Sequence, residues 1–322
     1  MTSITKPTQT EPLPTAEKNQ ESYRYAHLLP HFSQDRYPPL TPFEHVDPGH
    51  RALNHANPRA FLENATSIAE ITPHLGTEVV GVNLVELDSD GRDQLALETE
   101  GQTSIVNGVR ILDGASEHLD FGGSPLENKD RFRSLHIHPT SGHPRGYPEI
   151  HLVYRDADSN FNFEYGNSVT SILWHSDVSY ERQPPGLTTF FLLDQPKSGG
   201  DTLFASQVAV LKKLSPQFVA FLRTLKAVHS GVQQAEFSRS GKVGLKREES
   251  GAILNFLYDH IDKSADNQAR IKWAPYTVVI WDNRITAHSA IVDYKDTGER
   301  RHGARITSQA ERPIPALGSL EV

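Results

Sequence analysis

The segment Trp174-His175-Ser176-Asp177 places an imidazole and a carboxylate two residues apart, directly after an apolar run. In an extended chain, residues i and i+2 project to the same side, so both side chains can bind one metal ion. A lone His-x-Asp usually has no metal role, and a third ligand has to come from elsewhere. His288, a few residues after the apolar run YTVVIWD, is the candidate.

Two neutral imidazoles and one carboxylate form the facial triad that non-haem iron(II) prefers. The triad leaves positions open for a bidentate 2-oxo acid and for dioxygen. Zinc hydrolysis is the chemical competitor, but the sequence contains no His-Glu-x-x-His helix. Cysteine is absent, which excludes zinc-thiolate sites and thiol nucleophiles. Any metal must therefore be bound by histidine and carboxylate.

Basic residues follow His288 and favour a 2-oxo acid. Arg301 and Arg305 are four residues apart, and the planar guanidinium binds a carboxylate or a sulfonate through two parallel hydrogen bonds. The alternative is that Arg300, Arg301 and Arg305 form a solvated basic strand edge.

The elements that must position these residues are mostly predicted strands. Four β-branched or aromatic runs are bounded by turn residues, at 149–156, 168–177, 187–194 and 276–282. The segment 71–87 suits a strand pair, residues 88–100 a short helix, and the run SIVNGVRIL has strand character. Two amphipathic helices are expected, one opening at Ser215-Pro216 and one over residues 248–261. This pattern fits a mainly β core with helices packed outside it.

Composition narrows the class of protein. The net charge of the 322 residues is −8 and no long Lys/Arg block is present, so a nucleic-acid partner is not expected. No run of 18 apolar residues and no basic-then-apolar leader is found, which predicts a soluble cytoplasmic protein without a membrane partner. Residues 1–60 read as a disordered or irregular extension. Residues 61–322 would form one domain with a helical insertion at about 207–262.

Several ordered motifs together resemble the taurine/2-oxoglutarate dioxygenase family, and most closely its fungal sulfonate dioxygenases. They are WHSDV, QPPG, SGGDTLFAS, WDNR with His288 four residues later, and ERRHGARIT, within a match over residues 37–313. The resemblance implies a double-stranded β-helix, the cupin-like jelly roll, with the metal at its mouth. It also implies Fe(II), 2-oxoglutarate and dioxygen, a small anionic substrate, and a homodimer or homotetramer.

The resemblance assigns roles to individual residues. His175, Asp177 and His288 match the iron ligands and so the catalytic centre. Thr202 and Arg301 match the residues that bind 2-oxoglutarate. Arg305 matches the residue that pairs with the substrate's anionic group, and His138 matches a histidine that contacts the substrate. Ser141 and Ser171 occupy two further substrate positions. Other histidines, His151 among them, are expected not to be ligands.

Three departures from the family pattern affect the substrate end. About forty or fifty residues have no counterpart near residues 238–246. Either this is a true deletion, which would open one side of the pocket, or the printed sequence omits a mobile lid over the active site. The strand SIVNGVRIL is less apolar than usual. Ser141 replaces a tyrosine, and Ser171 an asparagine that is frequent in taurine enzymes.

The predicted reaction is oxidative decarboxylation of 2-oxoglutarate to succinate, coupled to hydroxylation of a carbon beside the substrate's anionic group. With an organosulfonate this releases sulfite and an aldehyde. Two alternatives stay open: a dioxygenase of fungal secondary metabolism that hydroxylates, desaturates or cyclises a larger acid, and a non-catalytic jelly roll that binds an anion or a partner.

Overall fold

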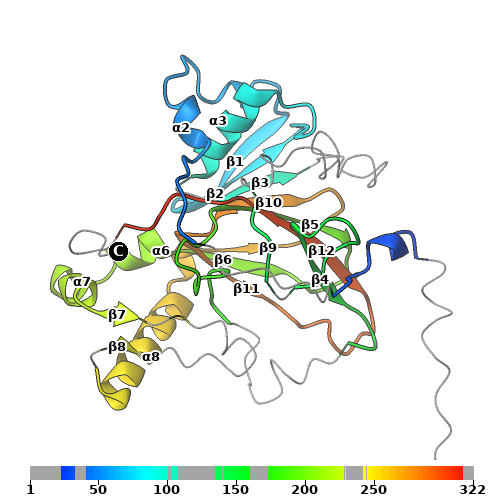
Figure 1. The fold of residues 1–322 in the computed structure, drawn as a ribbon. Helices are drawn as coiled ribbons and strands as arrows, with labels where there is room; N and C mark the ends of the chain where they lie inside the picture. The colour runs from blue at the N-terminus through cyan, green and yellow to red at the C-terminus, as the bar shows by residue number, and fades with distance from the viewer. Residues whose placement is uncertain are drawn as a thin grey trace, which may run out of the picture.

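Two β-sheets make up most of the chain that the structure, a computed structural model, describes (Figure 1). The described residues are 23–32, 41–100, 103–107, 135–139, 141–159, 173–227, 229, 242–243 and 245–314. Within these ranges the protein is mainly β with some helices.

The larger sheet has seven strands in the order β1-β2-β3-β10-β5-β12-β4. Its strands are β1 (Ser67–Thr72), β2 (Leu75–Val80), β3 (Thr103–Asn107), β4 (Ile150–Arg155), β5 (Leu187–Asp194), β10 (Val278–Asp282) and β12 (Arg301–Thr307). Neighbouring strands are antiparallel except β2 and β3, which are parallel. Strand β12 lies between β5 and β4, so both edges of the strand that carries Arg301 and Arg305 are hydrogen-bonded.

The smaller sheet has the order β11-β6-β9. Its strands are β6 (Thr202–Ser206), β9 (Gln268–Ile271) and β11 (Thr286–Ala290), and a separate short pair joins β7 (Lys226–Ala227) to β8 (Lys242–Val243). His175 extends the smaller sheet through an isolated antiparallel bridge to His288 on β11.

The core fills the space between the two sheets. Phe190 and Val279 of the larger sheet pack with Phe204 of β6, Trp273 and Trp281 in one buried cluster. Strand β10 is buried along its whole length, because residues of both of its faces pack in hydrophobic clusters. Val278 and Ile280 pack in a second cluster with residues from η2 and the loop before α3.

Helices lie at two ends of the β structure (Figure 1). Helix α2 (Gly49–Ala52) contacts α3 (Ser89–Thr99) beside β3 and β10. Helices α6 (Gln207–Lys212), α7 (Pro216–Arg223) and α8 (Arg247–Lys263) gather at the lower left of the figure. Three short 3₁₀ turns complete the described elements: η1 (Ala26–Leu28), η2 (Ala60–Leu62) and η5 (Ala265–Asn267).

Local capping chemistry explains where the predicted helices begin. The Asp88 side chain accepts a hydrogen bond from the Gly91 amide at the start of α3, at 2.8 Å. Ser215 caps α7 in the same way, and Pro216 occupies its first turn. The predictions of helices at 88–100, 215–225 and 248–261 are confirmed, as are strands at 149–156, 187–194 and 276–282.

The structure differs from the sequence-based expectation around the His-x-Asp motif. Of the predicted strand 168–177, residues 168–172 lie outside the described part. From Leu173 onward the chain forms a single bridge at His175 and a turn at Asp177, not a strand. The positive φ of 53° at Val178 marks the turn that ends the extended backbone.

Residues 41–60 of the expected N-terminal extension pack on the folded part, because Ala52 is fully buried and Asp47 is nearly so. The boundary at residue 60 stays a prediction. Among the described helices, none is both long and apolar enough to cross a membrane.

Candidate metal and co-substrate site

The three predicted ligands come together. His175 Nε2 lies 3.9 Å from Asp177 Oδ1, and His288 Nε2 lies 3.6 Å from Asp177 Oδ2. The two imidazole rings have their centroids 4.3 Å apart. Within the described ranges this is the one group of three or more His, Cys, Asp or Glu side chains with ligand atoms all within 4.8 Å of one another.

Backbone pairing fixes the two histidines relative to each other. The amide of His175 donates to the carbonyl of His288 at 3.1 Å, and the amide of His288 donates to the carbonyl of His175 at 2.9 Å. His175 Nδ1 donates to the Leu173 carbonyl at 2.9 Å. This hydrogen bond leaves Nε2 as the nitrogen that can bind a metal.

Asn283 holds the backbone of Asp177, and sequence reasoning missed it. Its Oδ1 accepts from the Asp177 amide at 2.8 Å, and its Nδ2 donates to the Asp177 carbonyl at 2.9 Å. Asn283 follows strand β10 directly in Trp281-Asp282-Asn283-Arg284. The sequence signal for Asn283 was its place in the WDNR motif, where an amide side chain directly follows an apolar strand.

Aromatic residues surround His288. The Trp281 ring centroid is 5.2 Å from the imidazole, and the Phe204 ring stacks on it at 6.0 Å. Burial, and then the nearby His175, lowers the pKa of His288 to about 3. The imidazole is therefore neutral at physiological pH, which is the form that binds a metal.

Asp177 is ionised although it is buried. Burial alone would raise the pKa of this carboxyl, but the Arg305 guanidinium, whose Nη1 lies 2.5 Å from Oδ1, holds it well below its usual range. Oδ2 is buried and accepts no hydrogen bond from any described residue. A charged, unpartnered oxygen beside two imidazole nitrogens is costly unless a cation satisfies it. The donor set therefore fits a divalent metal ion.

Thr202 and Arg301 lie around the turn that precedes β6. In the pairing of β6 with β11, Phe204 is opposite His288 and Thr202 is opposite Ala290, so Thr202 faces the same side as His288. Its Oγ1 accepts from Trp273 Nε1 at 3.1 Å. Arg301 is buried and its Nε donates to the Gly200 carbonyl at 3.1 Å.

Glycines are required in this turn and in strand β12. Gly199 and Gly200 have φ of 81° and 73°, in the left-handed region. On β12, Gly303 lies between the two arginines on the same face, and a Cβ there would stand 2.3 Å from Cζ of Phe190.

At the substrate end, Ser141 Oγ and His138 Nδ1 are hydrogen-bonded at 2.7 Å. The His138 ring lies 4.7 Å from the ring of His151, and the Nη2 of Arg305 donates to Nδ1 of His151. Arg305 thus links Asp177 to a pair of histidines. Ser171, the remaining predicted substrate contact, lies outside the described residues.

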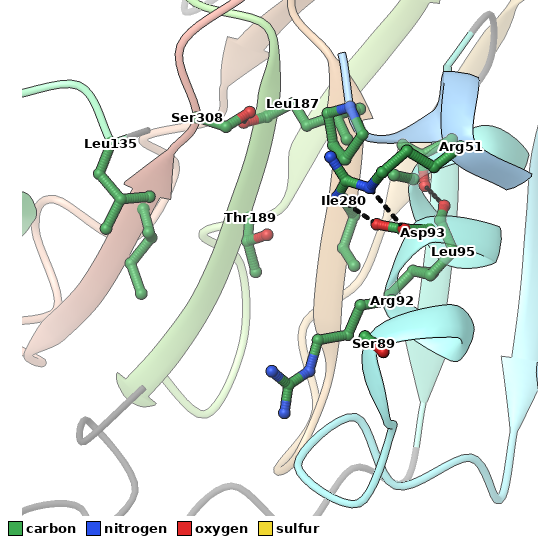
Figure 2. Close-up of a pocket in the computed structure, with 14 residues that line it drawn as sticks. Arg51, Ser89, Arg92, Asp93, Leu95, Leu135, Leu187, Thr189, Ile280 and Ser308 are labelled. Atoms are coloured by element: carbon green, nitrogen blue, oxygen red, sulfur yellow. Dashed lines mark hydrogen bonds and ion pairs between the residues drawn. The ribbon is translucent and has the colours of Figure 1, made fainter. Parts of the chain in front are cut away.

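A separate pocket of about 410 Å³ lies on the face of the larger sheet opposite to Arg305, between that sheet and helices α2 and α3 (Figure 2). Leu187, Thr189, Ile280 and Ile306 line it, with the Arg51–Asp93 ion pair at its rim. Ile306 follows Arg305 on β12, so alternation along the strand sends the two side chains to opposite faces. None of the predicted site residues lines this pocket.

Comparisons with known proteins agree with this geometry. The model of the "Taurine catabolism dioxygenase TauD, TfdA family" matches residues 67–240 and 231–307. The chain belongs to this family. It is 37% identical to an "Alpha-ketoglutarate-dependent sulfonate dioxygenase" of Saccharomyces cerevisiae, over 92% of this chain and 81% of that protein. It is 35% identical to the "Alpha-ketoglutarate-dependent dioxygenase cnsP" of Penicillium expansum, over 94% of this chain and 91% of that protein.

Among solved structures, a taurine dioxygenase from Burkholderia xenovorans has the same fold, with a TM-score of 0.60. It is 23% identical, over 78% of this chain and 91% of that one. Together with the two sheets described above, this likeness supports the expected fold class, a mainly β dioxygenase fold with flanking helices.

The alignments also bear on the short connection expected near residues 238–246. The match to the family model falls into two parts that overlap at residues 231–240. The 338 aligned positions shared with the yeast protein take in 92% of the 322 residues, about 296, so about 42 positions have no residue of this chain. This number agrees with the forty or fifty residues expected to have no counterpart, and residues 230–241 lie outside the described part.

Proposed function

We propose that this protein is an Fe(II)- and 2-oxoglutarate-dependent dioxygenase that hydroxylates a small organosulfonate, with release of sulfite. The observation that carries the proposal is the convergence of His175, Asp177 and His288 in direct contact with Arg305. Family membership supplies the reaction class. The yeast relative is named as a sulfonate dioxygenase, which supports the substrate class.

Charge balance supports an anionic substrate. Arg301 and Arg305 are both buried, and an iron(II) ion would add two positive charges beside the single ionised carboxylate of Asp177. The dianion 2-oxoglutarate would offset part of this positive charge, and an anionic substrate would offset more. Buried charge is strongly unfavourable unless it is paired, so the site favours an anionic substrate.

Each residue of the chain has a distinct task in this proposal. His175, Asp177 and His288 would hold the metal, which supplies the oxidative chemistry when bound. Arg301 would bind the distal carboxylate of 2-oxoglutarate through its guanidinium, and the Thr202 hydroxyl would hydrogen-bond the same molecule. Arg305 and His138 would orient the substrate so that the carbon beside its anionic group faces the metal.

Aromatic walls complete the arrangement. Phe204 and Trp281 exclude water from the buried side of His288. A low-polarity wall protects a reactive centre from side reactions and strengthens the ionic contacts that position both anions.

The test separates the metal centre from the substrate site. On anaerobic mixing of protein, iron(II) and 2-oxoglutarate, a weak visible charge-transfer band is expected, and oxygen then gives succinate in the presence of a sulfonate. His175→Ala should abolish the band because it removes a ligand. Arg305→Ala should keep the band and lose turnover. Absence of the band in the wild-type protein would refute the proposal, and loss of the band in Arg305→Ala would refute this division of labour.

A larger carboxylic acid is the second candidate substrate. The Penicillium relative, at 35% identity, is named as a dioxygenase without a sulfonate in its name. Ser141, where the resemblance led us to expect tyrosine, leaves more room beside His138. Turnover of carboxylates with no turnover of any sulfonate in the same assay would select this alternative.

A further inference from the structure

His151 occupies a position at the substrate end that neither its sequence context nor the family match singles out. It lies on β4 directly opposite Arg305 of β12. Opposite residues of an antiparallel pair have neighbouring side chains on one face. The contact that results is the hydrogen bond from Arg305 Nη2 to Nδ1 of His151. The side chain is half-buried.

The contact with Arg305 fixes the tautomer of this imidazole. A guanidinium can only donate hydrogen bonds, so Nδ1 of His151 must be the unprotonated nitrogen. Burial, and then the charge of Arg305, lowers the pKa of His151 well below its ordinary value, which keeps the ring neutral. The single proton is therefore on Nε2. No hydrogen bond from Nε2 to another described residue is present.

The neighbours of His151 are groups that bind anions. Its ring lies 4.7 Å from that of His138, whose Nδ1 is engaged by Ser141. Arg305 carries the positive charge of the cluster, and it contacts Asp177, so the cluster adjoins the metal ligands. Two imidazoles and one guanidinium thus lie together on the face of the larger sheet that also carries Arg301.

We propose that His151 is a specificity-determining residue, whose Nε2–H donates to the anionic group of the substrate alongside Arg305 and His138. A sulfonate has three acceptor oxygens and a carboxylate has two, so a third donor favours the sulfonate. A buried donor that a carboxylate leaves unpaired penalises the carboxylate further. The proposal rests on the proposed function and names the group that selects its substrate class.

Two variants separate the donor role from the contact with Arg305. In His151→Asn the amide oxygen can replace Nδ1 as the acceptor for Arg305, but the Nε2 donor is lost. In His151→Gln the longer side chain carries an amide N–H to about the position of Nε2. We expect His151→Asn to lower kcat/KM for alkyl sulfonates, relative to carboxylates of matched chain length, by about 10-fold to 100-fold. The loss should lie mainly in KM, and His151→Gln should restore most of the preference.

Controls use the same holoprotein. His74→Asn, at the exposed turn between β1 and β2, should leave the preference unchanged. All variants should give the same charge-transfer band with iron(II) and 2-oxoglutarate. The 2-oxoglutarate concentration that half-saturates the band should also be unchanged, because His151 is not among the residues proposed to bind the iron or 2-oxoglutarate.

The outcomes are distinguishable. If the wild-type protein lacks the charge-transfer band, the proposed function is refuted, and this inference with it. If the band is present but no sulfonate is turned over, the substrate class and the role of His151 are both refuted. A normal band with an unchanged sulfonate preference in His151→Asn overturns the role of His151 alone. Equal losses in His151→Asn and His151→Gln, for sulfonates and carboxylates alike, point to a merely structural residue and overturn it as well.

Discussion

The ligand side chains of the metal cluster are held by different kinds of contact. His175 and His288 are joined by two backbone hydrogen bonds, whereas Asp177 lies in a turn and depends on the side chain of Asn283. A turn has fewer backbone hydrogen bonds than a strand to fix its residues. The backbone of Asp177 is therefore held by one buried amide, which also donates to the Pro185 carbonyl at 3.3 Å, while Arg305 contacts the carboxylate.

Asn283→Ala should weaken both folding and metal binding. The variant leaves the Asp177 amide and carbonyl without their partner in a site where Asn283 is 1% exposed. Unsatisfied buried groups cost about 1–3 kcal/mol each. We expect lower stability in urea and weaker iron(II) binding by titration, while Asn54→Ala, at an exposed turn, changes neither. Full metal affinity in Asn283→Ala would contradict the role assigned to this residue.

At the scale of elements, β12 is the strand on which the proposed anion sites depend. It carries Arg301 and Arg305 on one face, and it is held on both sides by β5 and β4. The irregularity in its pairing with β5 falls between His302 and Gly303. Pairing with β4 stays regular through this point, so the two arginines and His151 keep their register.

Gly303→Ala should destabilise the protein, because the added methyl group would stand 2.3 Å from the Phe190 ring in the core between the sheets. Overpacking of this kind costs about 1–3 kcal/mol. Gly251→Ala in α8 is the matched control, since a Cβ there meets nothing within 4 Å. It should stabilise by up to about 1 kcal/mol. Thermal unfolding of both variants measures the difference, and equal melting temperatures would contradict the packing argument.

At the scale of the whole molecule, the N-terminal segment is joined to β12. The Tyr23 hydroxyl and Nδ1 of His302 are hydrogen-bonded at 2.8 Å, and the Arg300 guanidinium lies 3.8 Å from the Tyr23 ring centroid. His302 is fully buried, with the Tyr154 ring 5.2 Å away. Burial lowers the pKa of His302 to about 4, and the charge of Arg300 acts in the same direction.

This buried histidine predicts a loss of stability in mild acid. In the unfolded chain His302 takes up a proton near its ordinary pKa of 6.5, whereas in the native protein it does so only near 4. The unfolded state therefore binds more protons between these pH values, and the free energy of unfolding falls as pH falls from about 6.5 to 4. The contribution of His302 is at most roughly 3 kcal/mol.

His302→Phe measures this contribution. Urea titrations at several pH values should give a slope of unfolding free energy against pH that is smaller, by up to one proton, than in the wild-type protein. The remaining slope comes from other buried histidines, such as His138, whose pKa is also lowered. An unchanged slope in His302→Phe would show that this histidine is not the group responsible.

Much of the fold follows from local patterns in the sequence. Periodicity and turn residues predicted β5 and β10, and the cap residue Ser215 with Pro216 predicted the start of α7, because these signals act within a few residues. The strand expected at 168–177 is wrong in its described residues, which form a bridge and a turn. An apolar run shows that a segment is buried, but it cannot show whether a neighbouring strand is placed to pair with it.

The sequence by itself determined which residue types are available to bind a metal and two anions. It predicted His175, Asp177 and His288 for the metal, and Arg301 and Arg305 for the anions. Ordered motifs were sufficient for this, since the chemistry lies in the side chains and their order. Only the tertiary structure decided which groups support them. Asn283 is 106 residues from Asp177, and His151 is 154 residues from Arg305. Contacts between such distant residues depend on strand register and turn geometry, which no local pattern specifies.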